Sequence, residues 1–497
     1  MLKKTRTVLA LVFLTGITLL FLDFTGAIHL YLGWMAKLQL LPAVLAGNVI
    51  VVAFFVLVTL LFGRTYCSII CPMGVMQDVF TWIGNRFKKN RFRYHRPCQW
   101  LRIVVLAVFV ILMVLGLNAI AVLIAPYSAY GRIASSILQP IYIGINNLLA
   151  RWAEHANSYA FYSVDTWMKG GITLLVAIIT LVVIGTLSLL TGRTWCNNIC
   201  PVGTVLGFLS KFSLFRPVID TDKCINCKKC EHNCKTKCIN IDGNHSIDMS
   251  RCVDCFDCID NCPKGAISYR RRNKKSEATS TATVDEERRK FLATTAAIGA
   301  STAIQAQEDK VDGGLAVIED KQIPVRTTRL EPAGAVSLKH FSNHCTACQL
   351  CVAECPNGVL RPSKELSTLM QPEMSFERGY CRPECVRCSE VCPTGAIKKI
   401  DVAEKSAIHI GMAVVVTKNC LPVAKGVKCG NCAEHCPAEA ILMVPLHADD
   451  DPDLPMTLKR PVVNTERCIG CGACEYLCHV RPFSAIHVEG RQTHIHE

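Results

Sequence analysis

Thirty of the 497 residues are cysteines, and after residue 220 most of them recur at a fixed spacing. Four segments read CxxCxxCxxxC, and two more are stretched versions of it. Three thiolates two residues apart wrap one corner of an iron–sulfur cube, and the fourth leaves on a separate turn to ligate the partner cluster in two-cluster proteins. Zinc prefers two CxxC pairs, and disulfides need no repeated period. The spacing therefore predicts [4Fe–4S] clusters.

The six motifs supply 24 candidate ligands, enough for six [4Fe–4S] clusters. In the first pair of motifs we predict one cluster on Cys224, Cys227, Cys230 and Cys262, and a second on Cys252, Cys255, Cys258 and Cys234. Cys238 is an alternative to Cys234. The later ligands are Cys345, Cys348, Cys351, Cys355, Cys381, Cys385, Cys388, Cys392, Cys420, Cys429, Cys432, Cys436, Cys468, Cys471, Cys474 and Cys478.

The composition points to a membrane rather than to nucleic acid. Hydrophobic residues make up 51% of the chain and charged residues 19%, which is apolar for a soluble protein. The formal charge of +14 does not indicate a nucleic-acid partner, because basic residues cluster beside apolar runs and each four-thiolate cluster carries roughly −2. Collagen, a disordered chain and a simple secreted disulfide scaffold are excluded.

Four apolar runs lie in the first 190 residues, at 8–22, 43–62, 103–124 and 171–190. The last three carry no charge and reach the roughly 20 residues that span a bilayer. We interpret the first as a retained span rather than a cleaved signal, because no small-residue cleavage site follows it. Residues 86–102 hold seven Lys or Arg and no acid, which predicts a cytoplasmic N-terminus and an outward loop over 126–170.

These features predict a multidomain chain. An α-helical membrane domain (1–210) would precede an α+β bacterial-ferredoxin-like domain with two clusters in the cytoplasm (211–270). A linker with a twin-arginine-like signal at Arg288 and Arg289 (271–306) would form a fifth span. It would place a four-cluster ferredoxin-like domain (307–497) outside the bacterial inner membrane. The alternative is a basic linker next to an alanine-rich helix.

A second repeat lies at the ends of two spans. Gly63 and Gly192 each open the pattern G-R-T-aromatic-CxxxCP-x-G, which contains Cys67 and Cys71 in one copy and Cys196 and Cys200 in the other. One interpretation is a helix start with Pro at the first turn and structural thiols. The other is a four-thiolate redox site, or an additional metal site, beside a quinone pocket.

Polar residues within the membrane are functional candidates. Asp23, His29 and Asn48 qualify by position, and His29 is a candidate for handling quinol protons because histidine titrates near neutral pH. The alternative for His29 is an interfacial residue without a role. His494 and His496 in the C-terminal tail are expected to be solvated.

Residues 1–270, with four spans, two CxxxCP motifs and two cluster motifs, resemble the NapH family of membrane ferredoxins from periplasmic nitrate reductase systems. They are also similar to the membrane core of NosR-type polyferredoxins. Residues 288–497 resemble the NapG/MauM family, so that the whole chain resembles a NapH–NapG fusion. The resemblance implies oxidation of quinol from the quinone pool and delivery of electrons to an exported reductase, often through a cytochrome.

The resemblance also implies how the last four motifs pair, the first with the fourth and the second with the third. The implied sets are Cys345, Cys348, Cys351 with Cys478; Cys468, Cys471, Cys474 with Cys355; Cys381, Cys385, Cys388 with Cys436; and Cys420, Cys429, Cys432 with Cys392. We expect the quinol dehydrogenase and electron-transfer component of an oxidoreductase system. The alternative is a maturation or reactivation factor that supplies electrons to an exported metalloenzyme.

Overall fold

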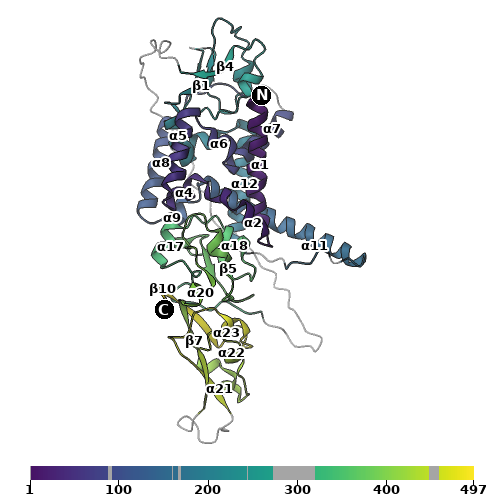
Figure 1. The fold of residues 1–497 in the computed structure, drawn as a ribbon, viewed down its shortest axis with the longest axis vertical. Coiled ribbons are helices and arrows are strands. Elements are labelled where there is room, and N and C mark those ends of the chain that lie inside the picture. The colour runs from purple at the N-terminus through teal and green to yellow at the C-terminus, as the bar shows by residue number, and fades with distance from the viewer. Residues whose placement is uncertain are drawn as a thin grey trace, which may run out of the picture.

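The computed structural model describes residues 2–87, 92–158, 160–165, 169–242, 245–272, 320–446 and 458–496. A helical domain occupies the middle of the molecule (Figure 1). A first cysteine-rich module (residues 211–272) covers the end that holds the N-terminus, and a second (residues 320–496) covers the opposite end. The predicted signal with Arg288 and Arg289 lies outside the described residues.

Four helices run along the long axis: α1 (Leu2–Leu22), α5 (Val49–Phe62), α8 (Gln99–Val114) and α12 (Gly171–Thr191). The predicted spans 43–62 and 103–124 are each interrupted. Asn48 caps α5 by accepting a hydrogen bond from the Val51 amide at 3.2 Å, and Gly116 turns the chain after α8 with a φ of 76°. Short helices complete the connections: α2 (Ala27–Leu32), α3 (Trp34–Lys37), α4 (Leu40–Leu45) and α9 (Asn118–Ala121).

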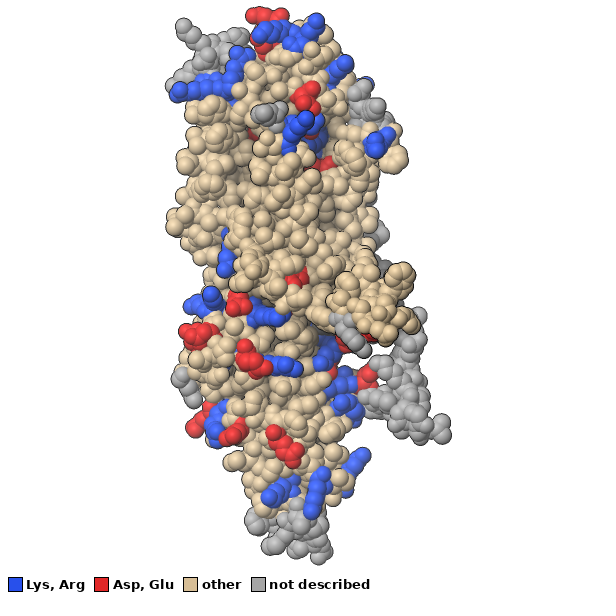
Figure 2. Space-filling view, turned by 45° about the vertical axis from the view of Figure 1, so that its right-hand side comes forward, with Lys and Arg blue, Asp and Glu red and all other residues tan. Residues whose placement is uncertain are grey.

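Three helices in the described part of the chain are long and apolar enough to cross a membrane, at Leu2–Leu22, Pro126–His155 and Gly171–Thr191. On the face that Figure 2 shows, the helical domain has a broad band with few charged side chains between two charged ends. These features indicate membrane association. The prediction of a loop over 126–170 is wrong for 126–155.

That segment forms α10 (Pro126–Ile133), the π-helical turn η1 (Ala134–Leu138) and α11 (Gln139–His155). Every residue of α10 is buried, and the helix packs against α7 and α12. Arg132 can be buried there because its guanidinium donates to the carbonyls of Val122 and Leu123, at 3.3 and 3.0 Å. Helix α11 projects away from the bundle (Figure 1).

The CxxxCP repeat folds twice into the same unit. Helix α5 continues into α6 (Thr65–Ile69) and α7 (Pro72–Phe87), and α12 continues into α13 (Thr194–Asn198) and α14 (Pro201–Ser210). Gly63 and Gly192 turn the two chains with φ of 78° and 77°, which favours glycine. Helix α7 packs against α12 and α14 against α5. Each repeat therefore places its last helix on the first helix of the other.

The first module holds two antiparallel strand pairs, β1 (Phe215–Ile219) with β4 (Ile267–Arg271) and β2 (Ile239–Asn240) with β3 (Ser246–Ile247). Its helices are α15 (Lys229–His232) and α16 (Asp257–Asp260). The module is seated on the end of α5, where the Phe62 ring stacks on Phe215 with centroids 5.8 Å apart. The Tyr269 hydroxyl donates to the Phe62 carbonyl at 3.0 Å.

The second module holds three antiparallel pairs: β5 (Leu360–Pro362) with β6 (Pro372–Met374), β7 (Ile408–Val415) with β10 (Ile486–His496), and β8 (Ile441–Pro445) with β9 (Lys459–Val463). Its helices are α17 (Leu338–His344), α18 (Leu350–Glu354), α19 (Arg387–Val391), α20 (Val402–Ser406), α21 (Leu421–Lys425), α22 (Asn431–Glu434) and α23 (Ala473–Leu477). Asn118 holds the module to the helical domain by donating to the Asn343 carbonyl at 2.6 Å.

Candidate iron–sulfur centres

The four regular CxxCxxCxxxC motifs share one local backbone shape. In each, the residues on both sides of the second cysteine have positive φ. These residues are Asn226 and Lys228, Asp254 and Phe256, Ala347 and Gln349, and Gly470 and Gly472. Left-handed residues next to right-handed ones make a concave turn whose amides face inward. The third cysteine then lies in, or at the start of, a one-turn helix, so the three thiols surround one point.

In the first module, the thiols of one predicted cluster line a common small cavity. Cys224, Cys227, Cys230 and Cys262 all contribute to its wall. Burial raises the pKa of Cys230 to about 11, with Cys262 and Cys224 adding to the effect. Iron binds the thiolate, so a site that disfavours the free thiolate needs the metal charge to hold it. The arrangement fits the predicted ligand set.

The second predicted set contains a fifth thiol. The sulfurs of Cys234 and Cys238 lie 3.6 Å apart, and Cys238 is buried. Burial raises the pKa of Cys255 to about 12, and Cys234 is among the neighbouring thiols that add to the shift. Cys234 also contributes to the raised pKa of Cys258. Cys238 in turn interacts with the thiol of Cys252, so Cys234 and Cys238 both lie beside this set, and the structure leaves both as candidates for its fourth ligand.

The second module groups its cysteines differently from the pairing that the resemblance implied. Burial and the thiol of Cys392 raise the pKa of Cys351, and burial and the thiol of Cys478 raise that of Cys432 to about 12. The four groups are Cys345, Cys348, Cys351 with Cys392; Cys381, Cys385, Cys388 with Cys355; Cys468, Cys471, Cys474 with Cys436; and Cys420, Cys429, Cys432 with Cys478.

The implied pairing of the first motif with the fourth and of the second with the third is thus wrong. Motifs that are neighbours in the sequence fold as two-cluster units, in which the fourth cysteine of each motif crosses to the adjacent motif. The first unit contains α18 and α19, which pack against each other, and the second contains α22 and α23.

The four groups form a row. Cys351 of the first group neighbours Cys388 of the second. Cys381 of the second group neighbours Cys471 of the third, and Cys474 of the third neighbours Cys432 of the fourth. The group with Cys348 lies against the helical domain, because a Cβ on Gly131 of α10 would stand 2.3 Å from the Cys348 carbonyl oxygen. The group with Cys420 lies at the other end, beside α21, which Figure 1 places far from the helices. The row leads away from the helical domain.

The repeated spacing of these groups is typical of iron–sulfur cubes rather than of single zinc ions, which prefer two CxxC pairs. Backbone amides also point at ligand sulfurs, as polarised cluster thiolates require. Examples are Ala440 to Cys436 at 3.3 Å and Ala347 to Cys345 at 3.4 Å.

The structure brings the four CxxxCP thiols together. Cys67, Cys71, Cys196 and Cys200 are all buried, in or just after α6 and α13, and each lies within electrostatic range of the others. Two fully buried arginines hold the site across the repeat boundary. Arg64 donates to the Asn197 side chain at 2.9 Å, and Arg193 donates to the Cys67 carbonyl at 2.9 Å.

The site adjoins both modules. On one side Arg64 donates to the Ser250 carbonyl at 3.1 Å and the Arg193 amide donates to the Lys235 carbonyl at 2.9 Å, so the first module contacts it directly. On the other side, the buried Tyr66 neighbours Cys71 and also Tyr127 of α10, and Tyr127 in turn neighbours Cys348. The four thiols therefore lie between the clusters of the two modules.

The structure places the other predicted polar residues, Asp23, His29 and His494, away from the four CxxxCP thiols. His29 lies in α2, near the backbone of Glu390 in the second module, far from the four thiols in sequence and separate from their contacts. The carboxylate of Asp23 accepts hydrogen bonds from the Gly26 and Ile28 amides, at 3.0 and 2.8 Å, and so fixes the start of α2. The expectation that His494 is solvated is wrong, because this residue of β10 is buried, whereas His496 is exposed as expected.

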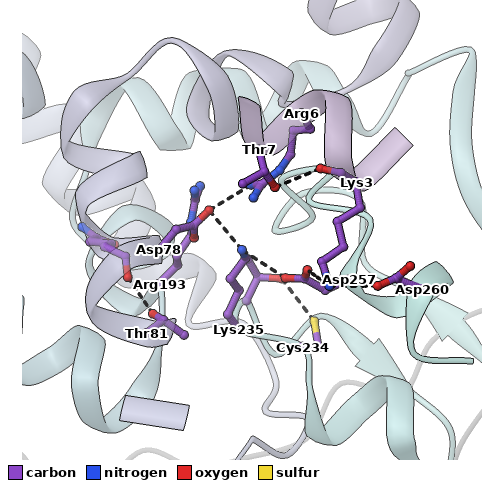
Figure 3. Close-up of polar contacts among 12 residues, drawn as sticks. Lys3, Arg6, Thr7, Asp78, Thr81, Arg193, Cys234, Lys235, Asp257 and Asp260 are labelled. Atoms are coloured by element: carbon purple, nitrogen blue, oxygen red, sulfur yellow. Dashed lines mark hydrogen bonds and ion pairs between the residues drawn. The ribbon is translucent and has the colours of Figure 1, made fainter. Parts of the chain in front are cut away.

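Sequence reasoning missed a buried ionic network around Asp78. Its carboxylate pairs with Arg6, Arg193 and Lys235 at 2.9, 2.6 and 3.0 Å, which ties α1, the second repeat and the first module to α7 (Figure 3). The signal available in the sequence was the Arg of each G-R-T motif, which stands beside an apolar span and needs a partner. Nothing in the sequence identified Asp78 as that partner.

Comparisons with known proteins agree with these centres. A family model described as a 4Fe-4S binding domain matches residues 45–90 and 173–219, which contain the two CxxxCP motifs. Models described as 4Fe-4S dicluster domains match residues 216–278, 248–359 and 425–481. The methylamine utilization ferredoxin-type protein MauM of Methylobacillus flagellatus is 31% identical over 170 residues, which cover 33% of this chain and 70% of the relative. The chain belongs to the MauM family of ferredoxin-type proteins.

Other relatives extend this MauM-type assignment. The ferredoxin-type protein NapG of Escherichia coli is 28% identical over 196 residues, covering 37% of this chain and 74% of NapG. The putative electron transport protein YccM of Escherichia coli is 26% identical over 200 residues, covering 40% of this chain and 48% of YccM. No solved structure matches. This MauM-family protein is an iron–sulfur electron-transfer protein with multiple [4Fe–4S] clusters.

Proposed function

We propose that the chain oxidises quinol and carries the electrons through the membrane to an exported reductase or cytochrome, as a NapH-like half joined to a NapG-like half. The 24 cysteines of the six motifs hold six [4Fe–4S] clusters. The observation that carries the proposal is the position of the four CxxxCP thiols, which contact the first module through Arg64 and Arg193 and approach Cys348 of the second through Tyr66 and Tyr127.

Such a path answers a physical problem. The hydrocarbon core is about 30 Å thick, too far for one fast electron-transfer step between modules on opposite sides. A redox site between the two modules divides that distance. The row of four groups in the second module then leads electrons to the group that contains Cys420, where a partner would accept them. Opposite placement of the modules supports an inner-membrane protein with 211–270 in the cytoplasm and 307–497 exported.

Two measurements test the proposal. The purified chain in lipid nanodiscs is mixed with a water-soluble quinol, and cluster reduction is followed by the loss of visible absorbance and by paramagnetic resonance. We expect reduction of clusters in both modules. Reporters fused after Tyr269 and after Glu497 should appear on opposite sides of the membrane. Two results would together indicate a maturation factor instead. Only a strong artificial reductant would then reduce the clusters, and the partner enzyme would need the chain only before turnover.

A further inference from the structure

A cavity beside the second predicted thiol set lies where α1, α7 and the first module meet. It has a volume of about 610 Å³ and is separate from the four CxxxCP thiols. Ala10, Leu11, Val79 and Trp82 form its apolar side, and Leu11, Val79 and Trp82 are exposed on the outside of the helices. A molecule dissolved in the membrane can therefore reach it sideways.

The opposite side of this cavity is polar. Arg6, Asp78, Lys235 and Asp257 line it, and Lys235 bridges the two carboxylates at 3.0 and 3.1 Å (Figure 3). Arg6 is buried, and its Nη1 donates to Asp78 at 2.9 Å, so this wall presents a fixed set of charged groups to the cavity.

The cavity wall is also the wall of a cluster site. Lys235 follows Cys234 in the chain, and Asp257 precedes Cys258, and both cysteines belong to the second predicted set. Successive Cα atoms are about 3.8 Å apart. A ligand in the cavity would therefore stand within a residue or two of the cluster that these thiols hold.

We propose that this cavity between α1, α7 and the first module binds the head group of a quinol, with its hydrocarbon tail leaving past Val79 and Trp82 and its ring oxygens at the polar side that Lys235 and Asp257 line. The inference rests on the proposed function and gives its substrate a site. Oxidation of one quinol to quinone releases two electrons and two protons. The cysteines of the first module would hold two [4Fe–4S] clusters, each able to accept one of the electrons, and both protons would leave to the water at the polar side of the cavity.

The test is photolabelling of the full-length protein in nanodiscs with an azidoquinone, followed by peptide mapping. Label on α1 around Leu11 or on α7 around Val79 supports the site, and label confined to other helices overturns it. The site is also overturned if anionic phospholipid abolishes the labelling while excess unlabelled quinone leaves it unchanged, because the cavity then holds a lipid head group.

A matched pair of variants adds a second readout. Val79 and Ile83 are one turn apart on α7 and are 37% and 36% exposed, but only Val79 lines the cavity. Val79→Trp fills the cavity, and we expect labelling about tenfold weaker with unchanged iron content, whereas Ile83→Trp keeps wild-type labelling. Equal labelling of the two variants overturns the site. A wild-type chain that labels in the cavity but is not reduced by quinol overturns the proposed function and not the site.

Discussion

The Nε atom of Arg193 lies 2.6 Å from Oδ1 of Asp78, where the second repeat meets α7 of the first. The Arg193 side chain is fully buried and that of Asp78 is 12% exposed. The same carboxylate also holds Arg6 and Lys235. One acidic side chain therefore fixes the repeat boundary, the start of α1 and the loop that carries Cys234.

Asp78→Asn should destabilise this junction strongly. The amide keeps the shape but leaves buried cations without their counter-charge, and breaking a buried pair from one side costs about 3–5 kcal/mol. We expect a lower midpoint of thermal unfolding in detergent and faster hydrogen exchange in the first module. Asp260→Asn is the control, because its pair with Lys3 is exposed and contributes less than about 1 kcal/mol. Equal effects of the two variants would contradict the hub role of Asp78.

The cysteine spacing and the G-R-T repeat are local in sequence, and they predicted the thiol groups of the first module and the meeting of Cys67 with Cys196. The grouping of Cys351 with Cys392 depends on which motif folds next to which, and spacing alone does not encode that. The search for long apolar runs likewise missed α10, because its buried Arg132 is accommodated by hydrogen bonds to two carbonyls of a neighbouring turn. Partners brought together by tertiary packing leave no local pattern.

Pairs of cysteine variants can test the grouping in the second module. Cys345→Ala with Cys392→Ala removes two ligands of one cluster, so the double variant should lose roughly four iron atoms. Cys345→Ala with Cys478→Ala removes ligands from two clusters and should lose roughly eight. Iron analysis of the purified proteins distinguishes these values. If the losses are reversed between the two double variants, the pairing of the first motif with the fourth is restored.

Acid should loosen the pair of strands β7 and β10. Burial, with His496 nearby, lowers the pKa of His494 to about 4 from an ordinary value of 6.5. The unfolded chain then binds a proton more readily than the folded one, so stability is present above pH 6.5 and is lost as the pH falls towards 4. The expected loss between pH 7 and pH 5 is about 2 kcal/mol.

His494→Phe should remove this dependence, because both ring nitrogens of His494 have no hydrogen-bond partner among the described residues and an apolar ring can replace them. Hydrogen exchange of the β10 amides at pH 5 and pH 7 measures it. Other buried groups titrate in the same module, such as Glu331, whose pKa burial raises to about 7. They affect both proteins, so the difference between wild type and variant isolates His494. An identical pH profile in the two proteins would show that the ring is not protonated in this range.

The four CxxxCP thiols should bind an iron centre of their own. Four buried thiolates on a cubane would carry a net charge of roughly −2, and the two fully buried arginines supply the opposite charge next to them. Arg64 Nη2 lies 3.9 Å from the Cys67 sulfur, and the Gly203 amide donates to the Cys200 sulfur at 3.3 Å.

Replacing Cys67, Cys71, Cys196 and Cys200 by serine should therefore remove roughly four iron atoms. The variant should keep the clusters of both modules, since their ligands lie elsewhere. Electron transfer between the modules should also stop, so that quinol reduces the clusters of the first module while those of the second stay oxidised. Equal iron in the two proteins, with both modules still reduced by quinol, would leave these thiols a structural role only.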